Sequence, residues 1–185
     1  MRNQILIEAG HSLFSPGAIA YNNLTEHHYN QEVQDMIVKK QQKAVALKGS
    51  SMIPITDNEE LQLNTVINLI NNTIGLSHGL SIHFNNNNIR ASGTECFIHP
   101  NTSKANRDRA IEICDVTSRI LGIPNRGIKY PAQSALGSLG IIERTRIPII
   151  LWEVCFLNRN DMEKYEANKQ TLTYEIRQLL FDKKF

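Results

Sequence analysis

Two histidines stand where neighbouring strands of a sheet would end. His11 follows a short apolar run at Ile5–Ile7, and His83 lies inside a second run at Leu80–Phe84. In α/β sheets ligands bind at the carboxyl ends of the strands, so the two imidazoles could converge on one point. A lone histidine is more often a satisfied or a surface residue than a metal ligand, so a third donor is needed to support a site.

Glu26 supplies such a donor at the predicted start of the first long helix. A loop that contains Pro16 and Gly17 connects it to His11, so its carboxylate could face the same ends of the sheet. Two imidazoles and one carboxylate, with a fourth position for water, form a known catalytic zinc arrangement. The same helix start also offers further donors if it begins in another register: His27, His28 and Glu32.

Glu153 lies in the otherwise apolar run Ile149–Phe156. A carboxylate is costly to bury without compensation, so it either pairs with a buried Arg or Lys or takes part in chemistry. Next to a zinc-bound water, it would accept a proton during nucleophilic attack and deliver it to the leaving amine.

The elements that must position these residues follow an α/β pattern, because short runs of Ile, Leu and Val alternate with segments of helical period. We expect one domain with a twisted, largely parallel sheet of about six strands and helices on both faces. The predicted strands are Gln4–Glu8, Ala44–Leu47, Leu80–Phe84, Glu95–Ile98, Ile141–Arg144 and Ile149–Val154. The predicted helices are Thr25–Lys40, Asn58–Thr73, Lys104–Leu121 and Asp161–Phe181. The segment around Pro131, with Gly127, Gly137 and Gly140, is predicted to be an irregular loop on the face that carries the site.

Composition excludes several other classes of protein. The 185 residues suffice for one domain with its own core, and the net charge of +2 gives no footprint of a nucleic-acid binder. No run approaches the roughly 18 apolar residues of a membrane span. The three cysteines show no C-x-x-C spacing, so we expect reduced thiols. Neither an export signal nor a wall-binding module is visible, and a monomer is expected.

A set of motifs then appears in a specific order along nearly the whole chain. They are Ile7-Glu8-Ala9-Gly10-His11-Ser12, Glu26 at a helix start, Ser81-Ile82-His83-Phe84-Asn85, Gly93-Thr94-Glu95, Asn125-Arg126-Gly127-Ile128-Lys129 and Pro148–Leu157. Together they resemble the catalytic domain of the zinc-dependent N-acetylmuramoyl-L-alanine amidases, which have a GH near the N-terminus, an S-I-H-x-N strand and a late V-E-x-G-F strand.

The resemblance implies that His11, Glu26 and His83 hold one zinc ion and that Glu153 is catalytic. It also implies bacterial peptidoglycan as the substrate, cut at the amide between N-acetylmuramic acid and L-alanine. Asn85, Arg126 and Lys129 are candidate substrate contacts. The two basic side chains could bind a carboxylate of the peptide stem, or they could form a structural salt bridge.

The chain departs from the family pattern at two places. The usual D-P-G-H-G-G is here Glu8-Ala9-Gly10-His11-Ser12-Leu13, which predicts a different path for the loop after the first ligand. The family has a glycine two residues after the catalytic glutamate, and this chain has Cys155 at that position. Strand alternation predicts that Cys155 faces the same side as Glu153, as a small packed residue rather than a ligand.

A compact amidase without a leader resembles a bacteriophage endolysin, which is made in the cytoplasm and reaches the wall once the membrane is permeabilised. Three alternatives stay open: a bacterial autolysin, a zinc peptidase that cuts another wall amide, and a silent domain that binds peptidoglycan without turnover.

Overall fold

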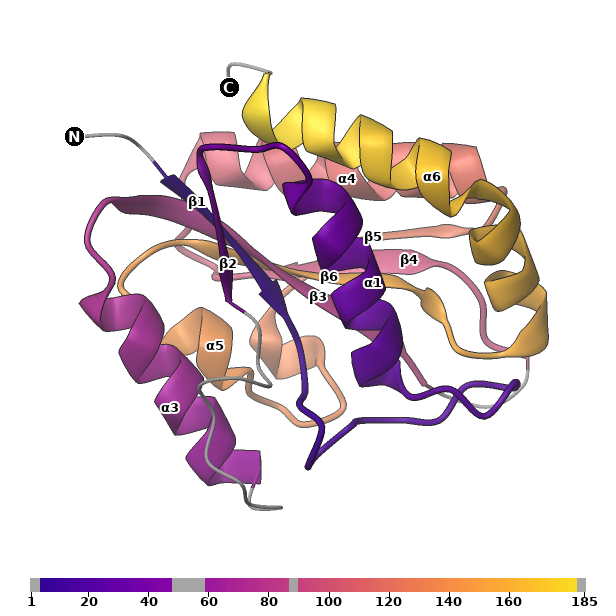
Figure 1. The fold of residues 1–185 in the computed structure, drawn as a ribbon, viewed down its shortest axis with the longest axis horizontal. Helices are drawn as coiled ribbons and strands as arrows, with labels where there is room; N and C mark the ends of the chain where they lie inside the picture. The colour runs from indigo at the N-terminus through magenta and orange to yellow at the C-terminus, as the bar shows by residue number, and fades with distance from the viewer. Residues whose placement is uncertain (1–3, 48–58, 87–89, 183–185) are drawn as a thin grey trace.

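A six-stranded sheet forms the centre of the molecule in the computed structural model, which describes residues 4–47, 59–86 and 90–182. The strand order is β2-β1-β3-β6-β4-β5 (Figure 1). The strands are β1 (Gln4–Ala9), β2 (Ala44–Leu47), β3 (Leu76–Asn85), β4 (Thr94–Ile98), β5 (Asn125–Lys129) and β6 (Ile149–Phe156). The first four strands in this order are parallel, whereas β4 runs antiparallel to β6 and parallel to β5. The predicted α/β class and largely parallel sheet are therefore confirmed.

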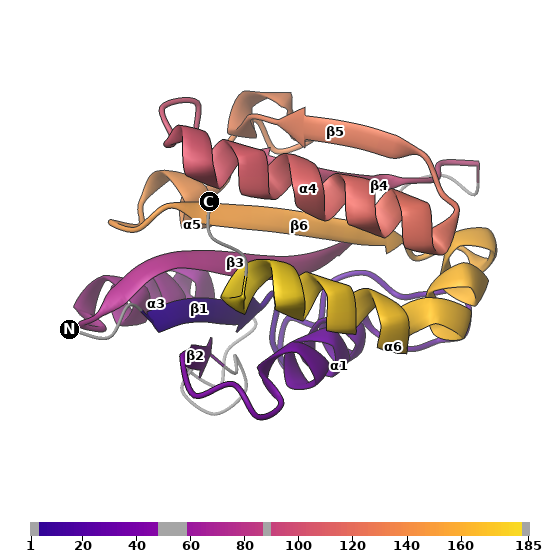
Figure 2. The same cartoon turned by 90° about the horizontal axis from the view of Figure 1, so that it is seen from above.

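Helices cover both faces of the sheet, as expected (Figures 1 and 2). On one face α1 (Glu26–Val38), α4 (Lys104–Leu121) and α6 (Arg159–Phe181) bury a large aliphatic and aromatic cluster. On the other face α3 (Glu59–Asn72) and α5 (Gly140–Glu143) cover a smaller cluster. A cavity on that face is lined by Glu8 of β1, His83 of β3 and residues of α3 and α5. None of the described helices has the length and hydropathy of a bilayer span.

Two elements differ from the prediction. Ile141–Arg144 was expected as a strand, but α5 occupies Gly140–Glu143 as a single helical turn. Its two isoleucines fill the smaller core cluster, and periodicity alone cannot distinguish such a short apolar run from a strand. Conversely, Asn125–Lys129 was placed in an irregular segment but forms β5. Among the described strands this one pairs only with β4, and it is mostly polar, so it lacks the apolar pattern that identifies a buried strand.

A β-bulge near the end of β6 overturns the predicted position of Cys155. His83 pairs with Glu153 and Asn85 pairs with Phe156, so two steps along β3 match three steps along β6. The extra residue reverses the alternation, and the Cys155 side chain packs into the larger cluster, with its sulfur 3.9 Å from that of Met162. Cys155 therefore lies on the opposite face from Glu153. All three cysteines are free and buried.

Asp161 fixes this bulged end of β6 to the loop that precedes β4. Its fully buried carboxylate accepts hydrogen bonds from Ser92 Oγ (2.6 Å), Gly93 N (2.9 Å) and Phe156 N (3.2 Å). The first turn of α6 thus anchors two segments that lead into the site.

We expect Asp161→Ala to lower the free energy of unfolding by about 3 kcal/mol, because several buried donors lose their acceptor. Urea denaturation of the two proteins measures the difference. Glu163→Ala, an exposed change on the same helix, serves as the control and should stay within about 0.5 kcal/mol of the parent. A loss below about 1 kcal/mol for Asp161→Ala would show that the backbone donors find other partners.

Candidate metal centre

His11, Glu26 and His83 come together at the carboxyl ends of β1 and β3. The ladder between these strands continues to a hydrogen bond from Gly10 N to Ile82 O (3.0 Å), which places His11 beside His83. His11 itself has a left-handed backbone, with φ of 64°. Glu26 is the first residue of α1, whose N-cap Thr25 accepts a hydrogen bond from His28 N. The positive end of the helix therefore stabilises the carboxylate.

The Glu26 carboxylate bridges the two imidazoles. Its Oε2 lies 3.2 Å from His11 Nε2, and its Oε1 lies 3.0 Å from His83 Nδ1. One ligand atom from each of the three side chains lies within 4.8 Å of the others. Two nitrogens and a carboxylate oxygen at this spacing are the donor set of a catalytic zinc site, so the residues present fit the ion.

The pKa values of Glu26 and His83 are shifted by the contact between these two side chains. Burial alone would raise the pKa of Glu26, but its contacts with His11 and His83 hold that pKa far below the usual range. Burial alone would lower the pKa of His83, but Glu26 outweighs it and raises the pKa to about 9. A metal ligand must be a neutral imidazole, so a cation would displace this proton and its affinity should fall with decreasing pH.

Gly10 lets the chain pass directly against His83. A Cβ atom added at Gly10 would lie 2.3 Å from both Cε1 and Nε2 of the imidazole. A rigid backbone position cannot accept that contact without a shift of the ring, which is itself held by Glu26.

We therefore expect Gly10→Ala to weaken zinc binding by about 10- to 100-fold, the range seen when a partner that orients a metal ligand is lost. Competition with a chromophoric chelator measures the affinity. Gly122→Ala is the control: this residue caps α4 outside the site with a left-handed backbone (φ 62°), so the variant should lose some stability but keep the affinity of the parent for zinc. Equal affinities for Gly10→Ala and the parent would show that the ring adapts at no cost.

The alternative donors at the start of α1 do not join the group. His27 is buried, and its Nδ1 lies 3.3 Å from the carbonyl oxygen of Gly10, which it helps to position with Asn30. Glu32 accepts hydrogen bonds from Tyr165 and Lys169 on α6. His28 packs edge-on against Tyr29. The register that makes Glu26 the third donor is thus the one observed.

Glu153 lies next to this group across the sheet. It pairs in register with His83 on one side and with Glu95 on the other. Its Oε2 is buried and has no hydrogen-bond partner among the described residues. Burial, together with the charges of Glu26 and Glu95, raises the pKa of Glu153 to about 8 in spite of the opposing effect of His83. Such a carboxyl group is suited to taking up and releasing a proton near neutral pH.

The three candidate substrate residues converge on Glu95. This buried carboxylate accepts hydrogen bonds from Asn85 Nδ2 (2.8 Å), Arg126 Nε (2.6 Å) and Lys129 Nζ (2.5 Å). Burial would raise the pKa of Glu95, but the bonds from the two basic side chains lower it. The structural salt bridge left open by the sequence is present. A role of these residues in binding substrate stays a prediction.

Two residues of the site were not assigned a role from the sequence. Ser81 donates a hydrogen bond of 2.5 Å to the buried Glu8, on the sheet face that carries His83. The sequence contained a signal for this pair, because Glu8 lies in the otherwise apolar β1, and a carboxylate buried there needs a partner or a role in chemistry, as Glu153 does. Period-two alternation from His83 also places Ser81 on that face.

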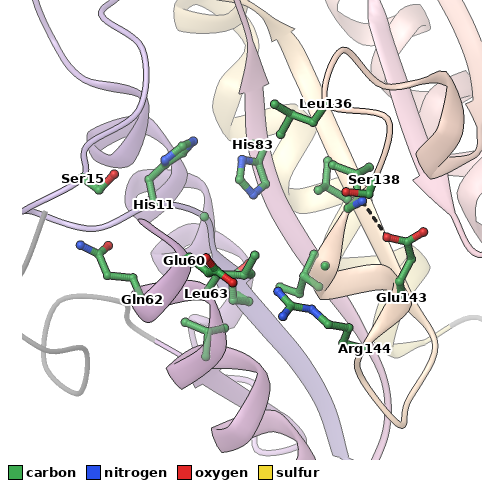
Figure 3. Close-up of a pocket in the computed structure, with 17 residues that line it drawn as sticks. His11, Ser15, Glu60, Gln62, Leu63, His83, Leu136, Ser138, Glu143 and Arg144 are labelled. Carbon is green, nitrogen blue, oxygen red and sulfur yellow. Dashed lines mark hydrogen bonds between the residues drawn. The ribbon is translucent and has the colours of Figure 1, made fainter. Parts of the chain in front are cut away.

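A cavity of about 710 Å³ opens beside the metal ligands. Figure 3 shows His11 and His83 at one end, with Glu60, Gln62 and Leu63 of α3 on one side. The opposite wall is the segment before and within α5, with Leu136, Ser138 and Glu143. The predicted loop around Pro131 thus reaches the site through its later part. Ser12 Oγ, in the loop after His11, donates to Gln62 Oε1 (2.6 Å) and ties that loop to α3.

Comparisons with known proteins identify the family and support the fold. A family model described as N-acetylmuramoyl-L-alanine amidase matches residues 5–179. No curated protein matches the sequence. Among solved structures, an N-acetylmuramoyl-L-alanine amidase from Clostridium difficile 630 is 20% identical with a TM-score of 0.77, and the match covers 98% of this chain and 96% of that one.

Two further structures share the fold over the whole domain. The catalytic domain of the CD27L endolysin, which targets Clostridia difficile, is 22% identical with a TM-score of 0.76, covering 100% of this chain and 99% of that chain. The catalytic domain of CwlV, an N-acetylmuramoyl-L-alanine amidase from Bacillus (Paenibacillus) polymyxa, is 21% identical with a TM-score of 0.71 and 97% coverage of both chains.

Proposed function

The chain belongs to the N-acetylmuramoyl-L-alanine amidase family, and from this premise we propose that its activity depends on one zinc ion held by His11, Glu26 and His83. The observation that carries the proposal is the convergence of these three side chains within 4.8 Å, next to Glu153, whose buried Oε2 has no hydrogen-bond partner among the described residues. The substrate is peptidoglycan, and the bond cut joins N-acetylmuramic acid to L-alanine.

The residues of the site have two roles, metal binding and proton transfer. A zinc ion in this site would supply Lewis acidity that polarises the amide carbonyl and makes water a stronger acid. His11, Glu26 and His83 hold that ion, with Glu26 compensating part of its charge. Glu153 accepts the proton of the attacking water and then gives it to the leaving nitrogen of L-alanine. The Oε2 atom of Glu153, which is buried and has no hydrogen-bond partner among the described residues, is the atom that we propose carries this proton.

The test is digestion of purified peptidoglycan with metal-loaded and chelator-treated protein. We expect the loaded protein to release soluble peptide with new L-alanine amino termini, the chelated protein to release none, and added zinc to restore release. Mass spectrometry of the products identifies the bond. Cleavage between stem residues would favour a peptidase, and binding without release would favour a silent wall-binding domain.

For the biological role we propose lysis of a bacterial host late in phage infection, after the membrane has been permeabilised. The match to the CD27L endolysin domain over its full length supports this role. Its test is a fall in turbidity when the protein is added to permeabilised bacteria. A gene neighbourhood of sporulation or wall-turnover genes, instead of a holin gene, would favour an autolysin.

A further inference from the structure

Two surfaces of opposite character flank the proposed metal centre. One is the cavity beside His11 and His83, referred to below as the aliphatic cavity. The other is the group of Arg126 and Lys129 around Glu95, referred to below as the cation cluster. The strand order places them on opposite sides of Glu153, since β1 and β3 lie on one side of β6 whereas β4 and β5 lie on the other.

The aliphatic cavity has a mostly apolar surface. Its aliphatic lining comes from α3, from the α5 segment and from β6: Leu63, Val66, Leu136, Leu139, Ile141 and Leu151. Apart from the proposed metal ligands His11 and His83, which also line it, its charged lining is mainly acidic, with the carboxyl groups of Glu8, Glu60 and Glu143 against the guanidinium of Arg144. An anionic ligand would meet repulsion there, whereas a neutral ligand with methyl groups would be accepted.

The cation cluster has the opposite sign. Arg126 and Lys129 share one carboxylate, Glu95, so the group carries a net positive charge. Their side chains keep 35% and 24% of their surface exposed, whereas Glu95 keeps 4%. The positive charges therefore face solvent and the compensating negative charge is buried. A carboxylate-bearing ligand is attracted to such a surface.

The two halves of the substrate differ in the same way. The muramoyl half is neutral once its lactyl group is amidated, and it carries the acetamido and lactyl methyl groups. The peptide stem carries carboxylates. We propose that the aliphatic cavity binds the muramoyl half and that the stem runs from Glu153 over β4 and β5 to the cation cluster.

The position of Glu153 agrees with this direction. The leaving nitrogen belongs to L-alanine, the first residue of the stem, and Glu153 must reach it to deliver the proton. Glu153 stands between His83 and Glu95 in register, on the way from the ligands to the cation cluster. A substrate bound in the reverse direction would put acidic stem residues against Glu60 and Glu143. This inference rests on the proposed role of Glu153.

Fragment binding tests the direction without any measurement of turnover. The two probes are the N-methylamide of N-acetylmuramic acid and the dipeptide L-alanyl-D-glutamic acid, each titrated into zinc-loaded protein and followed by NMR. We expect the sugar amide to shift the methyl resonances of Val66, Leu139 and Ile141. We expect the dipeptide to shift the backbone amides of Arg126 and Lys129.

Two matched variants sharpen the result. Leu136 lines the cavity and is 81% exposed, whereas Ile74 is 79% exposed and lies outside the cavity lining. Leu136→Asp adds a charge to the cavity rim and should weaken binding of the sugar amide by about tenfold. Ile74→Asp should leave it unchanged, and neither variant should alter binding of the dipeptide.

Three results would overturn the inference: sugar-induced shifts at β5, dipeptide-induced shifts in the cavity, or no cavity shift at the highest soluble concentration of the sugar amide. Failure of the proposed function would look different, since digested peptidoglycan would then lack new L-alanine amino termini whatever the fragments do.

Discussion

Glu153→Gln is expected to lower the rate of peptide release by about 10²- to 10⁴-fold, the usual contribution of a positioned general acid–base group. Glutamine keeps the shape of the side chain but cannot accept the proton. The proposed metal ligands lie just after β1, on β3 and at the start of α1, so the protein should keep its zinc. Release of peptide from peptidoglycan, with metal content determined on the same samples, measures both quantities.

The dependence of activity on pH gives a second measurement on the same variant. A general base works only when ionised, so activity falls as the pH drops through its pKa. Burial raises the pKa of Glu153 to about 8, and a nearby cation would lower it, so the acidic limb of kcat/KM should lie below pH 8. The limb should disappear in Glu153→Gln. Exposed Glu163→Gln is the control, and if both variants cut as fast as the parent, Glu153 is structural.

Glu26→Gln is expected to weaken zinc binding by more than about 100-fold, which exceeds the usual effect of losing a partner outside the ligand set. The change removes the only carboxylate of the proposed donor set, together with the charge that attracts the cation between two imidazoles. Zinc affinity by chelator competition measures the loss, and activity should fall with it unless zinc is supplied in excess.

Glu32→Gln provides the matched control on the same helix. Its carboxylate faces Tyr165 and Lys169, so the variant should keep the affinity of the parent for zinc even if its stability changes. Full retention of zinc by Glu26→Gln would remove this residue from the ligand set. Loss of zinc from Glu32→Gln alone would point to a different register for the site.

The sequence predicted the elements whose apolar residues form a compact run or a clear helical stripe. β1, β2 and α4 appear at or within one residue of their predicted bounds. The prediction was wrong where a tertiary contact determines whether a segment forms a helix, a strand or a loop. The two isoleucines of α5 are consistent with either element until the core that they fill is known. β5 is held by pairing with β4, which leaves little trace in its own composition.

Among the residues of the site, too, those with a local sequence signal could be predicted and those that depend on tertiary contacts could not. His11, Glu26, His83 and Glu153 could be proposed because each is an unusual residue at a strand end, a helix start or an apolar run. The partner of Arg126 and Lys129 could not, since the contact with Glu95 joins residues 31 and 34 positions apart through a strand pair. The sheet face on which Cys155 lies depends on the β-bulge in β6, and no local sequence pattern indicates that bulge.

The burial of all three cysteines bears on the resistance of the protein to oxidation. Peptidoglycan lies outside the membrane, where thiols are no longer kept reduced. Cys96, Cys114 and Cys155 are enclosed in the larger core cluster, and burial raises the pKa of the Cys96 and Cys155 thiols well above the ordinary value. Thiols that are neither ionised nor in contact with solvent react slowly with oxidants and with other proteins. On the proposed route from a reducing host cytoplasm to the wall, the folded protein would therefore not crosslink to its neighbours.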